Sequence, residues 1–262
     1  MRLRAAVSRH ARATLALCAL AALPLVAQAG PPFQTDDPDL VPLGHYEFYV
    51  FSGSDGTPIE TDPVGPAFEF NCGALPNMQL HVVTSFGASI PASGPAAYGL
   101  LDTEVGVKYR LLSETEDRPE IGIFPMVELP TGSASRSLGV GTTWYRLPVW
   151  IEKSWAPWTT YGGAGYEIVH QAGFHSFPFA GWLLQRDVGK KWTLGGEVWY
   201  HGPEGPITPE RRYSTMIDLG GYYYFSKPAS QLLFVLGHTA FGQPETYAYL
   251  GLYWTWGGKD GS

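Results

Sequence analysis

The strongest constraint on the fold is an alternation of side chains with a period of two residues, which runs through most of the chain after residue 44. Residues 102–111 show it best, because threonine, aliphatic or aromatic side chains alternate there with glycine or ionisable ones. Neighbouring side chains point to opposite faces only on a β-strand. A strand of this kind separates an apolar medium from a polar one. Its repetition predicts an all-β fold, a transmembrane antiparallel up-and-down β-barrel.

Twelve segments of this kind follow one another along the chain. We expect strands at residues 44–52, 62–73, 78–86, 100–112, 120–130, 139–153, 158–170, 177–187, 191–201, 212–225, 231–240 and 246–256. The connections after even-numbered strands are mostly short, whereas those after odd-numbered strands tend to be longer. Outer-membrane barrels have short periplasmic turns, longer external loops and both chain ends in the periplasm. The sequence therefore predicts a bacterial outer-membrane protein, with residues 87–99 as a mobile external loop.

The first 29 residues have the features of a cleaved secretory signal peptide. Arginines precede a nearly apolar run at residues 14–26, and Ala27 and Ala29 provide the small residues of a cleavage site after Ala29. An apolar run of about 13 residues is too short to span a bilayer, which argues against a membrane anchor.

Three further parts follow the signal peptide. Residues 30–43 are rich in proline and aspartate, and we expect them to form an extended periplasmic lead-in or a segment tucked into the barrel mouth. The barrel is expected at residues 44–256, followed by a polar tail at residues 257–262.

The predicted mature chain is acidic. Four of the 17 basic residues lie in the signal peptide, so 17 − 4 = 13 basic residues stand against 24 acidic ones, a net charge of 13 − 24 = −11. This balance argues against nucleic acid and anionic membrane surfaces as partners. Only Cys72 remains after residue 29, so neither a disulfide framework nor a cysteine-based metal site is expected. No later run of about 18 apolar residues exists that would form a transmembrane helix.

Aromatic residues and prolines indicate further local features. Six tryptophans lie near predicted periplasmic strand ends, where aromatic rings collect at the membrane interface: Trp150, Trp155, Trp158, Trp192, Trp254 and Trp256. A soluble protein with an aromatic core is the alternative, but it leaves the charged strand faces unexplained. Pro125 and Pro148 each lack a backbone donor and lie roughly opposite each other in the predicted hairpin, so we expect a bulge or bend there. The facing of strand 177–187 stays open, because residues 182–184 are all apolar.

Six stretches spread over the mature chain carry a resemblance to a known family. They are residues 31–38 (PPFQTDDP), 102–110 (DTEVGVKYR), 129–132 (LPTG), 153–165 (KSWAPWTTYGGAG), 194–200 (LGGEVWY) and 247–252 (YAYLGL). Together they resemble the outer-membrane barrel transporter family described as "MetA-pathway of phenol degradation" proteins. The resemblance implies a channel-like outer-membrane barrel. The link of that family to phenol catabolism is contextual, and nothing in this sequence selects an aromatic substrate.

The sequence offers no arrangement typical of catalysis, and we expect no enzyme, no cofactor and no metal. His175 and Ser176 are adjacent, and neighbours on a strand point to opposite faces, so they do not form a nucleophile–base pair. The other histidines have no metal-ligand spacing: His45, His81, His170, His201 and His238. Residues 162–165 (GGAG) precede no helix, which favours a bend or a close-packed wall over a phosphate loop.

Ionisable side chains on the polar strand faces are expected to line the lumen. They are Glu47, Glu69, His81, Asp102, Glu104, Lys108, Arg110, Glu128, Arg146, Glu167, Glu197 and Asp218. Hairpin pairing predicts that Glu128 faces Arg146, and that Arg146 lies between Glu128 and Glu167. Charges within a membrane pair with one another or line water, and rings of carboxylates favour cations. The pattern predicts a constriction with modest cation preference, with a purely structural network as the alternative.

The opposite strand faces should contact lipid, and their apolar members include Phe68, Phe70, Leu80, Val82, Val105, Val107, Val149 and Leu194. The function favoured by the sequence is passive passage of small hydrophilic or amphipathic solutes through a narrow, net-acidic lumen. An outer-membrane hydrolase of lipid or surface polymer, and a closed structural barrel, are the alternatives. The expected partners are outer-membrane lipid and a small-molecule solute. The solute, the oligomeric state and whether residues 30–43 or 87–99 plug the lumen stay open.

Overall fold

The computed structural model describes residues 32–225 and 230–258. The predicted signal peptide and most of the predicted tail lie outside these residues. Among the described residues the elements are β1 (His45–Gly56), β2 (Glu60–Leu75), β3 (Met78–Pro91), β4 (Ala97–Leu100), β5 (Thr103–Leu112), β6 (Glu120–Ile123), β7 (Met126–Leu129), the 3-10 turn η1 (Ala134–Arg136), β8 (Trp144–Trp155), β9 (Trp158–Val169), β10 (Phe177–Val188), β11 (Trp192–His201), β12 (Ser214–Tyr224), β13 (Ser230–Gly242) and β14 (Thr246–Gly257). No helix in this part of the chain is long and apolar enough to cross a membrane.

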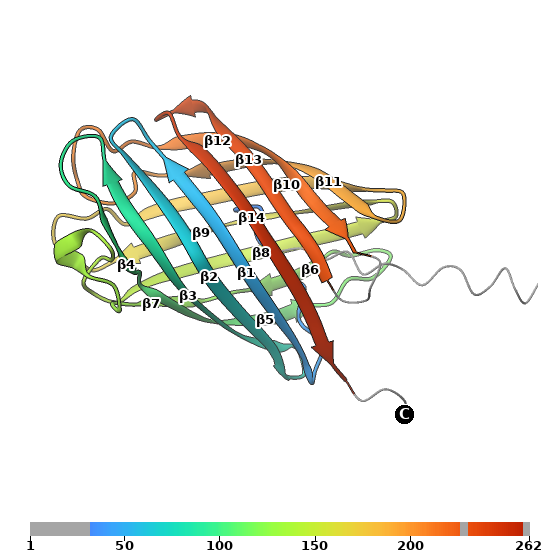
Figure 1. Cartoon of the computed structure of the whole chain (residues 1–262). Coiled ribbons are helices and arrows are strands. Elements are labelled where there is room, and N and C mark those ends of the chain that lie inside the picture. Colours follow the sequence, from blue (N-terminus) through green and yellow to red (C-terminus); the bar gives the residue numbers. More distant parts are fainter. Residues whose placement is uncertain (1–31, 226–229, 259–262) are drawn as a thin grey trace, which may run out of the picture.

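The strands form one closed antiparallel barrel (Figure 1). β4 and β5 both pair with β3 and act as one wall strand, and β6 and β7 both lie between β5 and β8 and act as another. The fourteen segments therefore make twelve wall strands, and β1 pairs with β14 to close the wall. The predicted twelve-stranded barrel is confirmed. We call the end where β1 begins and β14 ends the terminal end, and the opposite end the loop end.

The wall is interrupted where the prolines predict a defect. Ile123 pairs with Val149 and Met126 pairs with Arg146, and neither ladder includes the two residues between β6 and β7. Pro125 has no N–H to donate, and Phe124 turns its ring inward, where it is only 3% exposed. The predicted bend is therefore present and breaks one wall strand in two.

The outer face of the barrel is apolar, as the alternation predicts. Leu80, Val149 and Leu194 are more than 40% exposed on the isolated barrel, whereas the inward-facing Lys108 is 5% exposed. The other predicted lipid-facing residues are exposed or half-exposed: Phe68, Phe70, Val82, Val105 and Val107. A band of exposed apolar side chains on a closed barrel suits a lipid bilayer.

In the wall, two sequence-based assignments are wrong, and one that the sequence left open is now settled. The prediction that Trp150 lies at the membrane interface is wrong, because its side chain points into the lumen and is 1% exposed. The prediction that residues 87–99 form one mobile loop is wrong, because β3 continues to Pro91 and pairs with β4 through Ser89 and Ala97. Only residues 92–96 form the turn. The facing of β10 is now settled, with Leu183 buried inside and Leu184 exposed outside.

Candidate functional site

Most of the described part of the lead-in, residues 32–41, lies inside the barrel, whereas Pro42 and Leu43 are exposed at its terminal end. The carbonyl of Pro32 accepts a hydrogen bond from the hydroxyl of Tyr247 at 3.1 Å, and the amide of Val41 donates to Oε1 of Gln79 at 2.8 Å. Tyr247 is near the loop end of β14 and Gln79 near the terminal end of β3. The segment therefore runs lengthwise through the lumen, which corresponds to the second of the two arrangements considered from the sequence.

Glycines in the wall make room for this segment. A Cβ added at Gly181 would lie 1.8 Å from Oγ1 of Thr35, and one at Gly73 would lie 2.1 Å from the carbonyl oxygen of Pro42. The segment then turns into β1 at Gly44, whose φ of +76° favours glycine. Glycine is needed at these positions because backbone or short side chains of the segment touch the wall directly.

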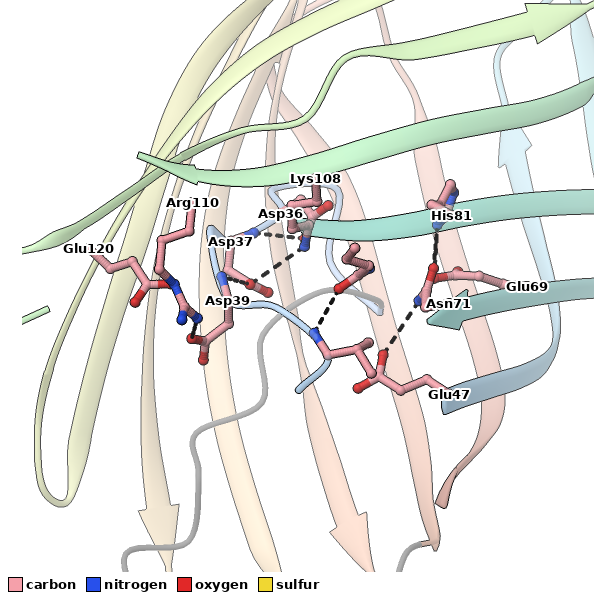
Figure 2. A network of polar contacts seen from close by, with 12 residues as sticks. Asp36, Asp37, Asp39, Glu47, Glu69, Asn71, His81, Lys108, Arg110 and Glu120 are labelled. Atoms are coloured by element: carbon pink, nitrogen blue, oxygen red, sulfur yellow. Dashed lines mark hydrogen bonds and ion pairs between the residues drawn. The ribbon is translucent and has the colours of Figure 1, made fainter. Parts of the chain in front are cut away.

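Two cations of β5 hold the acidic part of the segment (Figure 2). Nζ of Lys108 lies 3.0 Å from Oδ1 of Asp36 and 3.6 Å from Oδ1 of Asp37. Arg110 contacts Oδ1 of Asp39 through Nη2 at 3.4 Å and Oε1 of Glu120 through Nε at 2.7 Å. Asp37 and Lys108 are 0% and 5% exposed, so each requires the other's charge. The sequence placed both cations in the lumen but assigned no partners from residues 36–39.

A second polar network surrounds His81 (Figure 2). Its Nδ1 lies 2.7 Å from Oδ1 of Asn71, and its Nε2 lies 2.8 Å from Oε1 of Glu104. The amide nitrogen of Asn71 donates to Glu69 at 2.8 Å and to Glu47 at 3.4 Å. These contacts link inward side chains of β1, β2, β3 and β5. The network orients several predicted lumen carboxylates toward one space.

The predicted pairing of Glu128 with Arg146 is wrong. Glu128 pairs with Trp144 on β8 and with Glu104 on β5, whereas Arg146 pairs with Met126 and Glu167. The side chain of Arg146 keeps the predicted contact with Glu167, at 3.4 Å between Nε and Oε1. The observed register of β7 on β8 is shifted by two residues from the predicted one. β8 begins only at Trp144, after an irregular loop that contains η1.

Three of the predicted lumen acids anchor a loop or the lumenal segment through hydrogen bonds. Both carboxylate oxygens of Asp102 accept backbone hydrogen bonds, from Gly132 and Val140 at 2.9 Å each, which anchors the loop before β8. Glu197 accepts hydrogen bonds from the backbone amides of residues 34 and 35, and Asp218 accepts one from the side chain of Gln34 at 3.3 Å. Glu197 and Asp218 thus hold the segment from the side opposite to Lys108.

A cavity of about 920 Å³ lies between the segment and the wall, and its lining comes mostly from strands between β1 and β8, with Tyr253 and Thr255 of β14 added. Its lining extends from Leu75 and Asn77 at the terminal end to Asp55 near the loop end. Nine of the twelve predicted lumen residues line it, namely Glu47, Glu69, His81, Asp102, Glu104, Lys108, Arg110, Glu128 and Arg146. Asp36, Asp39 and Asp55 add to these, so eight carboxyl groups face three Lys or Arg side chains in the described lining. The cavity is therefore net acidic.

The rest of the lumen is filled by aromatic and aliphatic side chains. One cluster includes Phe33 of the segment packed with Tyr49, Tyr161, Leu183, Tyr222, Leu233, Val235, Tyr249 and Tyr253. A second cluster contains Phe124, Met126, Trp150, Phe179, Trp199 and Met216. The guanidinium of Arg146 lies 4.6 Å from the ring centre of Phe179, which joins the charged and aromatic regions. The sequence analysis missed these clusters, although strands that are apolar on both faces, such as β10 and β14, carry a signal for them.

The serine and the glycine-rich stretch considered for chemistry both have structural contacts. Oγ of Ser176 contacts the backbone nitrogen and carbonyl oxygen of Val169, at 2.9 and 3.3 Å. Gly163 and Gly165 lie in β9, where an added Cβ would meet Val149 and Phe179, which confirms the close-packed wall. Within residues 32–225 and 230–258, no group of three or more His, Cys, Asp or Glu is arranged to hold a metal ion.

No known protein family and no curated protein matches this chain. Solved structures do match. An outer membrane channel from Pseudomonas putida F1 superposes with a TM-score of 0.68 at 14% identity, over 87% of this chain and 100% of that one. The NanC porin gives 0.55 at 8% identity, and the KdgM porin in complex with disordered oligogalacturonate gives 0.53 at 9%, each over 79% of this chain and 98% of the other. The chain therefore has the fold of outer-membrane channels and porins.

Proposed function

We propose that the protein is a passive outer-membrane channel for small hydrophilic or amphipathic solutes. The observation that carries this proposal is the cavity beside the segment, whose lining extends from the terminal end to Asp55 near the loop end. A twelve-stranded barrel is intermediate in width between filled eight-stranded barrels and open sixteen-stranded porins. The segment and the aromatic clusters narrow the lumen further, so the passage is restricted to one side of the barrel.

The lining favours cations. Eight carboxyl groups against three Lys or Arg side chains give the described lining an excess of negative charge. Glu104 and Glu128 are direct neighbours across the β5–β7 ladder, and both line the cavity. Carboxylates that line a pore raise the local concentration of cations and repel anions.

We also infer kinship with the phenol-degradation-pathway family of outer-membrane barrels. The motifs quoted above support it, and the shared fold with an outer-membrane channel is consistent with it. No solute is assigned from this kinship.

Single-channel recording of the purified protein in a planar bilayer tests the proposal. We expect a small conductance with cation preference, measured as the reversal potential in a salt gradient. Glu104→Gln combined with Glu128→Gln should reduce the cation preference. Glu116→Gln is the matched control, because Glu116 lies in an exposed turn at the terminal end. Anion preference in the unmodified protein would contradict the charge assignment.

A closed structural barrel is the second candidate, and one observation favours it. Phe33 anchors the segment in the aromatic cluster with 6% exposure, so the segment is packed rather than loosely placed. Absence of conductance in both the full protein and a variant lacking residues 32–40 would support this candidate and contradict the channel.

A further inference from the structure

One arginine, Arg186, lies on the lipid-facing side of the wall. It is exposed two residues before the end of β10, and its ladder neighbour on β11 is Leu194, which is also exposed. Asp187, the next residue, points the other way and accepts a hydrogen bond from the hydroxyl of Thr193 inside the barrel. Among the residues that the structure describes, Arg186 forms no ion pair.

Lys153, another outward-facing cation at the terminal end, has its partner within the chain. It follows the buried Glu152 on β8, and its Nζ lies 3.0 Å from Oε1 of Glu114 in the connection after β5. A cation on the lipid face costs little near the interface, but charges at a membrane are paired or hydrated. The charge and the five N–H donors of Arg186 therefore meet the membrane interface without a carboxylate from the described chain.

Aromatic rings surround this arginine and a second cation at the same end of the barrel. Cζ of Arg186 lies 5.2 Å from the ring centre of Trp158, and Nζ of Lys191 lies 5.8 Å from that of Tyr223. The ring of Trp192 lies 4.7 Å from Tyr223. Tryptophan and tyrosine rings collect at the membrane interface. We call these five side chains the basic–aromatic patch, and it contains two positive charges and no carboxylate.

We propose that the basic–aromatic patch binds the headgroup of an anionic phospholipid. Both chain ends of an outer-membrane barrel lie in the periplasm, so the terminal end meets the periplasmic leaflet. A guanidinium contacts two phosphate oxygens at once, and Lys191 adds a second positive charge that favours a headgroup with net negative charge. The rings contact the apolar part of the lipid below the phosphate. The predicted mature chain is acidic as a whole, and the patch is a local exception to that balance.

Lipid retention, measured by native mass spectrometry of the detergent-solubilised protein, tests the proposal. With phosphatidylglycerol and phosphatidylcholine of the same acyl chains supplied in equal amounts, we expect several-fold more bound phosphatidylglycerol. Arg186→Gln combined with Lys191→Gln should abolish this preference. The matched control, Arg118→Gln combined with Arg212→Gln, removes the same charge at exposed positions between strands and should keep it. Equal retention of both lipids by the unmodified protein, or an equal loss in both double variants, overturns the proposal.

Urea titration in vesicles tests the role of the Arg186 charge separately. Adding phosphatidylglycerol to phosphatidylcholine vesicles should raise the urea midpoint of the unmodified protein. Arg186→Gln should lose most of this gain, whereas Arg186→Lys should keep part of it, because lysine contacts phosphate as a point charge. The proposal is overturned by no gain in the unmodified protein, by an undiminished gain in Arg186→Gln, or by equal gains in the two variants. Neither experiment measures conductance, so the outcome is independent of the channel proposal.

Discussion

The two sides of the lumen are built on different principles. The side formed by β1–β8, which we call the charged half, holds the segment with ion pairs and provides most of the wall residues that line the cavity. The side formed by β9–β14, the aromatic half, packs most of the rings and aliphatic side chains around Phe33. Ion pairs hold a chain at defined atoms and leave space between them, whereas packed rings fill volume. The contrast explains how one barrel contains both a plugged region and a passage.

The largest effect is expected in the charged half, at Lys108. Lys108→Met leaves Asp37 buried beside an apolar side chain, and breaking such a buried pair costs about 3–5 kcal/mol. We expect this loss in the free energy of unfolding, measured by urea titration in lipid vesicles. Lys190→Met is the control, because Lys190 lies in an exposed turn. Equal losses in both variants would mean that the charged half does not depend on this ion pair.

The stability of the aromatic half should depend instead on how completely its side chains fill the available volume. Leu183→Ala removes a side chain that is 0% exposed in the cluster around Phe33, and comparable core truncations cost about 2–5 kcal/mol. Leu184→Ala changes the adjacent residue on the lipid side and should cost less. The same urea titration compares the two variants. A larger loss at Leu184 would contradict the packed core of this half.

Two depths on the lipid face of one strand, β5, offer a second contrast, between Val107 and Leu111. Arginine at the bilayer midplane on the lipid face of a barrel costs about 2–4 kcal/mol, whereas near the interface it costs about 0–1 kcal/mol. We therefore expect Val107→Arg to destabilise the folded barrel in vesicles more than Leu111→Arg, which lies near the terminal end of the same strand. Folding of the Val107→Arg protein without loss of stability would refute the assigned facing.

The smallest effect is expected where the segment meets the aromatic half, at Gly181. Gly181→Val inserts atoms into the space of Thr35, and overpacking of this kind costs typically about 1–3 kcal/mol. The strain should be relieved by displacement of the segment, seen as faster digestion by proteinase K and a larger conductance. Ala180→Val, on the lipid side, is the control. Unchanged digestion and conductance would show that the wall tolerates a side chain at residue 181.

The sequence predicts the barrel well because one physical rule governs its wall. Every wall strand alternates between lipid and lumen, so the period of two residues is repeated and few boundaries are misplaced. The charged half also follows from this rule, since an ionisable residue in the middle of an otherwise apolar strand has only the lumen to face. Lys108 and Arg110 illustrate this, because both side chains line the lumenal cavity.

The features that the sequence does not predict depend on contacts between distant parts of the chain. Alternation gives no facing for β10, because its residues 182–184 are all apolar. The register of Glu128 and Arg146 depends on a loop anchored by Asp102, which is 30 residues or more away from the amides that it binds. The pairing of Asp36 and Asp37 with Lys108 likewise joins segments that are 72 and 71 residues apart. Local patterns carry no information on such partners.

The seam between β1 and β14 bears on the order in which the barrel is assembled. His45 pairs with Gly257 and Gly56 with Thr246, so the two strands come from opposite ends of the chain. Pairings this distant in sequence form slowly, because the loop entropy is lost before the contacts form. The lumenal segment is joined to β1 through Gly44, with no intervening loop. We therefore expect the segment to reach its place when this seam closes, so that plug insertion and barrel completion occur together, late in folding.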